Sequence, residues 1–76
     1  MNNARRKQLA EIVDQMQELR ARLDELQSEE QEAFDNMPES LQQGEKGQQS
    51  EAAAERIGNA GDSLDEAISA IEEAQE

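Results

Sequence analysis

The sequence predicts an all-α fold: an antiparallel, coiled-coil-like helical hairpin that dimerises into a four-helix bundle. Apolar residues recur with spacings of three and four on both sides of one bend. The only proline, Pro38, lies in that bend. A chain of 76 residues buries only roughly 60% of its unfolded surface as a monomer, which favours an oligomer. We expect a single domain over residues 1–76.

The composition narrows the classes of function. With no cysteine and no histidine, the chain has no disulfide, no thiolate or imidazole metal ligand and no Cys- or His-based catalysis. A net charge of −12 disfavours direct contact with nucleic acid or anionic membranes, so a charged partner should have a basic surface. We expect no enzymatic activity and no cofactor. No apolar run approaches the roughly 18 residues of a membrane span, and a cytoplasmic protein is expected.

The first helix is expected over about residues 4–35, capped at its start by Asn2 or Asn3. No glycine or proline interrupts this range, and Val13 and Phe34 lie beside its apolar seam. The seam that the spacing indicates has one polar member and consists of Leu9, Ile12, Met16, Leu19, Leu23, Leu26, Glu30, Ala33 and Met37.

A bend and a short helical turn are expected over residues 36–49. Pro38 cannot continue the first helix and disfavours helical geometry at Met37. It suits the start of a new turn ending near Gln42, with Glu39 at the helix N-terminus. Gly44 and Gly47 then indicate a flexible link.

The second helix is expected over about residues 50–75, beginning at Ser50. Its seam alternates large and small residues: Ser50, Ala53, Ile57, Ala60, Leu64, Ala67, Ile71 and Ala74. Gly58 and Gly61 each cost about 1 kcal/mol of helix propensity, which suggests close helix packing. The alternative is that the stretch from Gly58 to Gly61 breaks this helix.

Two features favour an antiparallel hairpin. The large side chains of the first helix complement the alanine and glycine residues of the second. The hairpin also brings a basic N-terminal cluster to an acidic C-terminal one: Arg5, Arg6 and Lys7 near Glu72, Glu73 and Glu76. Val13, Phe34 and Ile68 lie off the main rows, and a homodimer would cover them.

The acidic residues near the bend are the candidate chemical groups. Glu30 lies on the apolar seam beside Glu29, Glu32 and Asp35, where carboxylates could hold a hard cation or supply a general acid. The alternative is a solvated end of the seam, because helical metal sites commonly pair Glu with His.

The same acids have a collective interpretation. Carboxylates along a rod can imitate nucleic-acid phosphates and occupy the basic channel of another protein; alternatively, they keep a small protein soluble. The apolar residues at the bend form a contact surface or close the end of the bundle. The expected partner-binding residues are Glu29, Glu32, Phe34, Asp35, Met37, Glu39 and Leu41.

The stretch EEQEAFDNMPESLQ, with the flanking heptads and the acidic LDEAISAIEEA end, resembles short acidic helical proteins encoded by bacteriophages and prophages. The resemblance implies a small accessory protein acting in the cytoplasm of a bacterial host. It brings no catalytic residues.

Together these expectations describe a non-enzymatic protein that binds a protein partner and inhibits a host nucleic-acid-handling or defence complex, partly through its acidic surface. The alternative is a structural coiled-coil spacer or assembly factor without inhibitory activity.

Overall fold

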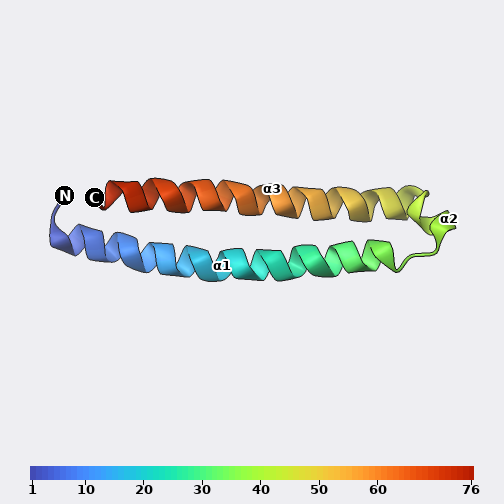
Figure 1. Cartoon of the computed structure of the whole chain (residues 1–76), viewed down its shortest axis with the longest axis horizontal. Coiled ribbons are helices and arrows are strands. Elements are labelled where there is room, and N and C mark those ends of the chain that lie inside the picture. Colours follow the sequence, from blue (N-terminus) through green and yellow to red (C-terminus); the bar gives the residue numbers. More distant parts are fainter.

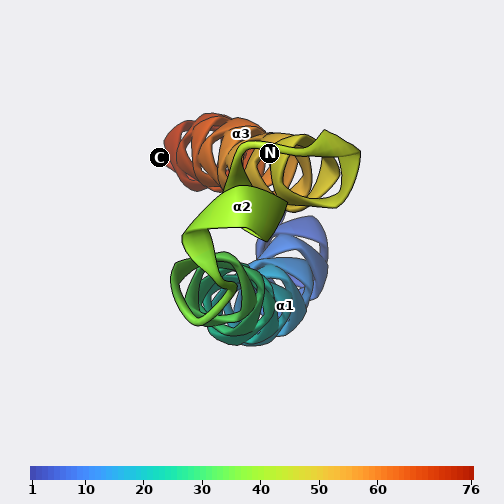
Figure 2. The same ribbon diagram turned by 90° about the vertical axis from the view of Figure 1, so that its right-hand side faces the viewer.

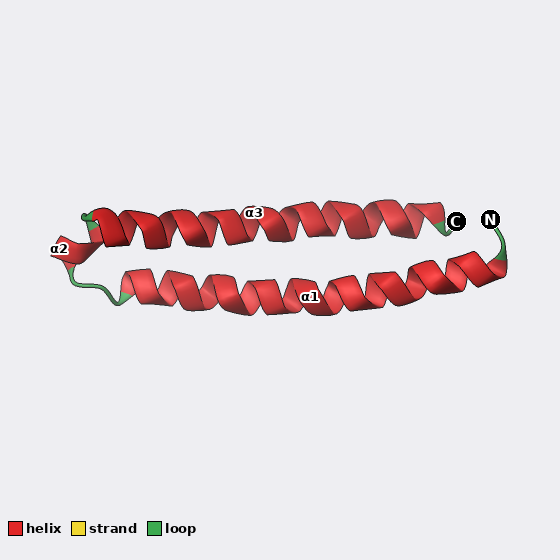
Figure 3. Cartoon of the chain, turned by 180° about the vertical axis from the view of Figure 1, so that it is seen from behind, coloured by secondary structure: helices red, strands yellow, loops and turns green.

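The computed structural model describes residues 1–76 and is entirely helical. It contains α1 (Asn3–Asp35), α2 (Glu39–Gln42) and α3 (Glu45–Ala74). The two long helices run side by side in opposite directions, so both termini lie at one end of a rod and α2 lies at the other (Figure 1). The same two-helix rod is seen from behind in Figure 3. The expected all-α class is confirmed.

The start of α1 is fixed by a capping hydrogen bond. The backbone N–H of Arg5 donates to Oδ1 of Asn2 at 2.8 Å, while Asn2 itself has an extended backbone. This bond satisfies one of the free donors at the helix N-terminus. Of the two asparagines expected as caps, Asn2 takes that role.

The bend follows from the backbone chemistry of Pro38. α1 ends at Asp35, and Pro38 adopts φ −55° and ψ 148°, which caps the short α2. The N–H groups of Leu41 and Gln42 both donate to the carbonyl oxygen of Pro38. Seen along the rod, α2 bridges the ends of the two long helices (Figure 2).

The start of the second long helix differs from the sequence-based expectation. α3 begins at Glu45 rather than near Ser50, so the expected flexible link through Gly47 is wrong. A Cβ atom at position 47 would overlap the backbone of Gln42. Gly47 is therefore explained by close packing of α3 against the end of α2. α3 is also continuous through Gly58 and Gly61.

The seam between α1 and α3 is displaced by one residue from half of the expected positions. Val13 and Ile68 are buried inside the hairpin, whereas Ile12 is 44% exposed. The expectation that Val13 and Ile68 need a second copy to cover them is therefore wrong. The observed inward row of α1 shares Leu9, Met16, Leu23, Glu30 and Met37 with the expected seam but completes it with Val13, Arg20, Gln27 and Phe34.

The inward row of α3 shifts in the same sense. It consists of Gly47, Ser50, Ala54, Ile57, Gly61, Leu64, Ile68, Ile71 and Gln75. The glycines explain the shift, because a Cβ at Gly61 would meet the guanidinium of Arg20, and one at Gly58 would meet the amide of Gln27. The space left by these glycines accommodates long polar side chains in the seam.

The hairpin has a large surface for its mass. Its accessible area is 5688 Å², against about 4,700 Å² for a globular monomer of 8.5 kDa. No side chain is fully buried. The Cα trace measures 58 × 15 × 12 Å. Neither long helix has an apolar stretch long enough to cross a membrane.

Candidate interaction surfaces

The acidic residues expected to bind a partner lie on the outside of the bend end. Glu29, Glu32 and Asp35 are exposed on the last turns of α1, and Glu39 is exposed at the start of α2. The carboxylate of Asp35 accepts a hydrogen bond from Nε2 of Gln31 at 3.1 Å. These carboxylates are therefore open to a partner, and no group of three or more acidic side chains converges as a metal site.

The three apolar residues of the bend do not form one patch. Phe34 and Met37 are half-buried on the inward side, whereas Leu41 is 48% exposed. The side chain of Gln42 donates to the carbonyl oxygen of Phe34 at 2.9 Å, which ties α2 to the last turn of α1. Phe34 and Met37 thus help to close the end of the hairpin, and Leu41 projects outward.

Glu30 lies in the seam and has a specific partner there. The hydroxyl of the buried Ser50 donates to Oε1 of Glu30 at 2.7 Å. A hydroxyl that meets a half-buried carboxylate offsets part of the cost of removing it from water. The structure gives Glu30 a packing role between α1 and α3.

Arg20 is the centre of the main ionic cluster, which was not expected from the sequence. Its guanidinium donates from Nε to Asp65 at 3.0 Å, contacts Asp24 one turn along α1, and approaches Asp62 at 3.8 Å. The hydrogen bond to Asp65, with the nearby negative charges, raises the pKa of Arg20 above its ordinary value despite partial burial. The cluster links the middles of α1 and α3.

One broad side of the rod carries exposed apolar side chains. Antiparallel helices are related by an approximate two-fold axis normal to the plane that contains both, so equal register positions fall on the same broad side. Val13 of α1 and Ala54 of α3 occupy the same register position in their helices. The residues immediately before them, Ile12 and Ala53, therefore lie on the same broad side, as do the residues one and two heptads further along each helix. We call it the leucine–alanine face, and it comprises Ile12, Leu19 and Leu26 of α1 with Ala53, Ala60 and Ala67 of α3.

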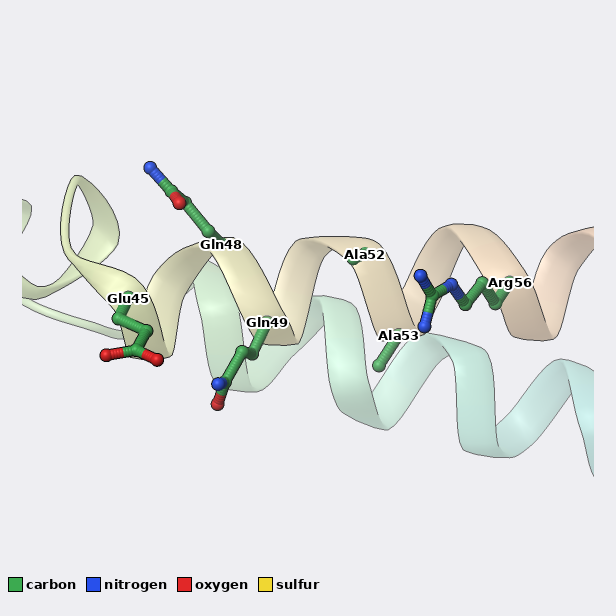
Figure 4. Close-up of a pocket in the computed structure, with 6 residues that line it drawn as sticks. All are labelled: Glu45, Gln48, Gln49, Ala52, Ala53 and Arg56. Atoms are coloured by element: carbon green, nitrogen blue, oxygen red, sulfur yellow. The ribbon is translucent and has the colours of Figure 1, made fainter.

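One hollow on this side is lined by residues of both helices. This open hollow of about 350 Å³ is lined by four leucines and one arginine: Leu19, Arg22, Leu23 and Leu26 of α1 and Leu64 of α3. A second, more polar hollow of about 410 Å³ follows the first turns of α3. In Figure 4, Gln48 points away from α1, whereas Gln49 and Ala53 point towards its side. Both hollows are shallow grooves in a surface.

Charge is distributed unevenly between this face and the remaining surface. The face consists of the rows at heptad spacing through Ile12 and Ala53, and the strips directly outside it are the rows through Arg22 and Arg56. These rows together contain only one of the 19 acidic residues, Glu29. Four of the seven basic residues lie there: Arg5, Arg22, Lys46 and Arg56. The carboxylates are therefore concentrated on the other sides of the rod.

The sequence contained one signal for the unexpected seam. Arg20 and Gln27 follow Val13 at heptad spacing and precede Phe34 in the same row. The more apolar neighbouring row, with Ile12 and Leu19, outweighs this polar row in any comparison of hydrophobicity. Comparison with known proteins gives no match, either to a family model, to a curated protein or to a solved structure.

Proposed function

We propose that this chain is a non-enzymatic, homodimeric accessory protein that binds a basic protein surface through its outward carboxylates. The target proposed is a nucleic-acid-handling or defence complex of a bacterial host, which the protein inhibits in the cytoplasm by occupying a groove made for nucleic acid.

The observation that carries the proposal is the density of carboxylates along the rod. Nineteen acidic residues along 58 Å give one carboxylate for about every 3 Å, near the spacing of about 3.4 Å per phosphate of a single strand. A dimer of the same length doubles this density, and a duplex carries one charge per about 1.7 Å of its axis. After subtraction of the basic residues, two chains of charge −12 carry one net negative charge per about 2.4 Å of the 58 Å rod, somewhat below the linear charge of a duplex.

A second candidate function, a structural spacer or assembly factor, is supported by the exposed leucine row. Leu19 and Leu26 are 49% and 52% exposed, and such a row also suits an apolar assembly contact. The two functions differ in their salt dependence, because ionic contacts weaken steeply as salt rises and apolar contacts do not.

The test is capture of binding proteins from bacterial lysate by the immobilised chain at about 50 and 200 mM salt. We expect one specific nucleic-acid-binding partner that is lost at the higher salt. A variant with Glu29→Gln, Glu32→Gln and Asp35→Asn should capture less of it. The matched control removes three exposed charges near the termini, through Glu72→Gln, Glu73→Gln and Glu76→Gln.

A partner whose binding is insensitive both to salt and to this charge neutralisation would reject inhibition by the acidic surface and favour the assembly role. Phe34→Ala tests whether the apolar part of the bend contributes to binding independently of the acidic residues. We expect no contribution, because Phe34 is half-buried. Its capture should match that of the wild type once its folding is verified by circular dichroism.

A further inference from the structure

We propose that the leucine–alanine face is the surface on which a second copy of this chain docks, with the leucine row of each copy against the alanine row of the other. This inference rests on the dimer included in the proposed function and specifies its interface, which differs from the surface that the sequence suggests.

The single hairpin buries little of its own surface. Its accessible area of 5688 Å² exceeds that of a globular monomer of the same mass by roughly 1,000 Å². A stable interface buries about 800 Å² per partner. The broad side, 58 Å long and 15 Å wide along the Cα trace, has the dimensions to supply such an area.

The hairpin also leaves its more apolar row of α1 outside the seam. Its own seam includes Arg20, Gln27 and Glu30, whereas the more apolar row of α1 remains about half exposed. Burial of a leucine side chain is favourable in proportion to the apolar area that it removes from water. No side chain of the single chain is fully buried. Covering the leucine row in a dimer therefore adds apolar burial that the hairpin alone does not have.

The distribution of charge on this side of the rod also favours a second copy as the partner. Two chains of charge −12 repel, but the leucine–alanine face itself contains no carboxylate, and the strips directly outside it contain only Glu29. Its basic residues lie beside strips of acids, which in α1 are Glu11, Glu18, Glu25 and Glu32. When two such faces meet, Arg22 and Arg56 of each copy reach the acidic rim of the other. A basic partner would instead meet four like charges.

The pairing of the leucine row with the alanine row follows from the positions of these side chains along the long axis of the rod. Arg6 contacts Gln75 at one end of the rod, and Glu30 contacts Ser50 near the other. Between these contacts, Leu19 lies nearly level with Ala60. At the same spacing, Ile12 lies near the level of Ala67, and Leu26 near that of Ala53.

A two-fold axis along the rod therefore places each large side chain of α1 against an alanine of the second copy's α3. Large against small fills space without voids, as close-packed interiors require. An axis across the rod would instead place leucine on leucine and alanine on alanine.

The first experiment is sedimentation equilibrium of the full chain. We expect the wild type at twice the 8.5 kDa chain mass, and Leu19→Gln with Leu26→Gln to weaken self-association by about 100-fold or more. Leu41→Gln is the matched control, because Leu41 is equally exposed (48%) but lies at the bend. A wild-type monomer at about 1 mM, or a dimer unaffected by the double substitution, overturns the inference.

The second experiment uses the absence of native cysteine. A mixture of Leu19→Cys chains with Ala60→Cys chains should be crosslinked by a short bifunctional maleimide much faster than either chain alone. Faster crosslinking of Leu19→Cys alone would overturn the leucine-on-alanine arrangement.

Failure of this inference is distinguishable from failure of the proposed function. A monomer that still captures a basic partner in a salt-dependent manner rejects the docking face and retains the binding activity of the carboxylates. A dimer through this face that captures no basic partner does the reverse.

Discussion

At the scale of single residues, glycines determine where the hairpin is close-packed. A Cβ at Gly47 would overlap the backbone of Gln42, whereas one at Gly44 would make only ordinary contacts at 3.5 Å or more. Gly58 and Gly61 face the flexible ends of Gln27 and Arg20, which can move. Replacement by a larger residue should therefore have different effects at the four glycines.

Gly47→Ala is expected to destabilise the chain by about 1–3 kcal/mol, because backbone atoms must shift to relieve the overlap. Gly44→Ala is the control: it creates no overlap, but Gly44 is the N-cap of α3, where alanine is disfavoured, so a smaller loss of about 0.5–1 kcal/mol is expected. Thermal unfolding followed by circular dichroism measures both. If Gly47→Ala gains the roughly 1 kcal/mol of an ordinary helical Gly→Ala substitution, the close contact with Gln42 is wrong.

The ionic cluster of Arg20 should show a preference among its aspartates. A double-mutant cycle of Arg20→Gln with Asp65→Asn is expected to give a larger coupling free energy than one with Asp62→Asn. Asp65 accepts at 3.0 Å and Asp62 lies at 3.8 Å. Urea unfolding at low salt measures the coupling, and equal couplings would contradict the observed geometry.

The pH dependence of that coupling follows from the raised pKa of Arg20. A basic group whose pKa is higher in the folded state contributes stability at every pH below its unfolded value, and the contribution is lost as pH rises through the folded one. For arginine this lies beyond the range in which proteins are handled. The Arg20 contribution is therefore expected to persist from neutral to moderately alkaline pH.

At the scale of the helices, the register of α1 determines which apolar row faces α3. Val13 is 7% exposed and its neighbour Ile12 is 44% exposed. The two residues are both β-branched and adjacent, so they form a matched pair that separates burial in the hairpin from burial in a dimer.

Val13→Ala should lower the free energy of unfolding of the dissociated chain by about 1–2 kcal/mol, because it leaves a cavity in the seam. Ile12→Ala should have a smaller effect on that quantity and should instead weaken self-association. Unfolding at protein concentrations below the dimer dissociation constant, combined with sedimentation, separates the two effects. The opposite ranking in unfolding would indicate the register expected from the sequence.

At the scale of the whole molecule, one charge distribution affects two properties in opposite directions. A net charge of −12 opposes folding and dimerisation through self-repulsion, yet it favours association with a basic groove. Salt screens both interactions, since the Debye length falls from about 10 Å at 0.1 M to 3 Å at 1 M.

Raising sodium chloride from about 0.05 to 0.5 M should raise the melting temperature of the chain and strengthen its dimer while weakening capture of the basic partner. Differential scanning calorimetry and sedimentation measure the first two effects, and the capture experiment measures the third. Lower melting temperature at high salt would show that the Arg20 cluster, rather than self-repulsion, dominates the electrostatics of folding.

Local residue patterns are enough to predict that the chain is helical and where it bends. The three-and-four spacing requires helices, because only that period places the apolar residues on one side. Pro38 ends α1 because it lacks the N–H that the helix needs. Asn2 was one of two recognisable caps. All of these are local effects, which depend on residues within a few positions.

Packing between distant parts of the chain determines which rows face each other, where α3 begins and which residues remain exposed. Hydrophobicity favours the row of Ile12 and Leu19, but the seam is decided by the space opposite each side chain. Gly58 and Gly61 provide that space for Gln27 and Arg20. The position of Gly47 inside α3 likewise depends on its contact with the backbone of Gln42. Such fits join residues far apart in the chain, and composition and periodicity do not describe them.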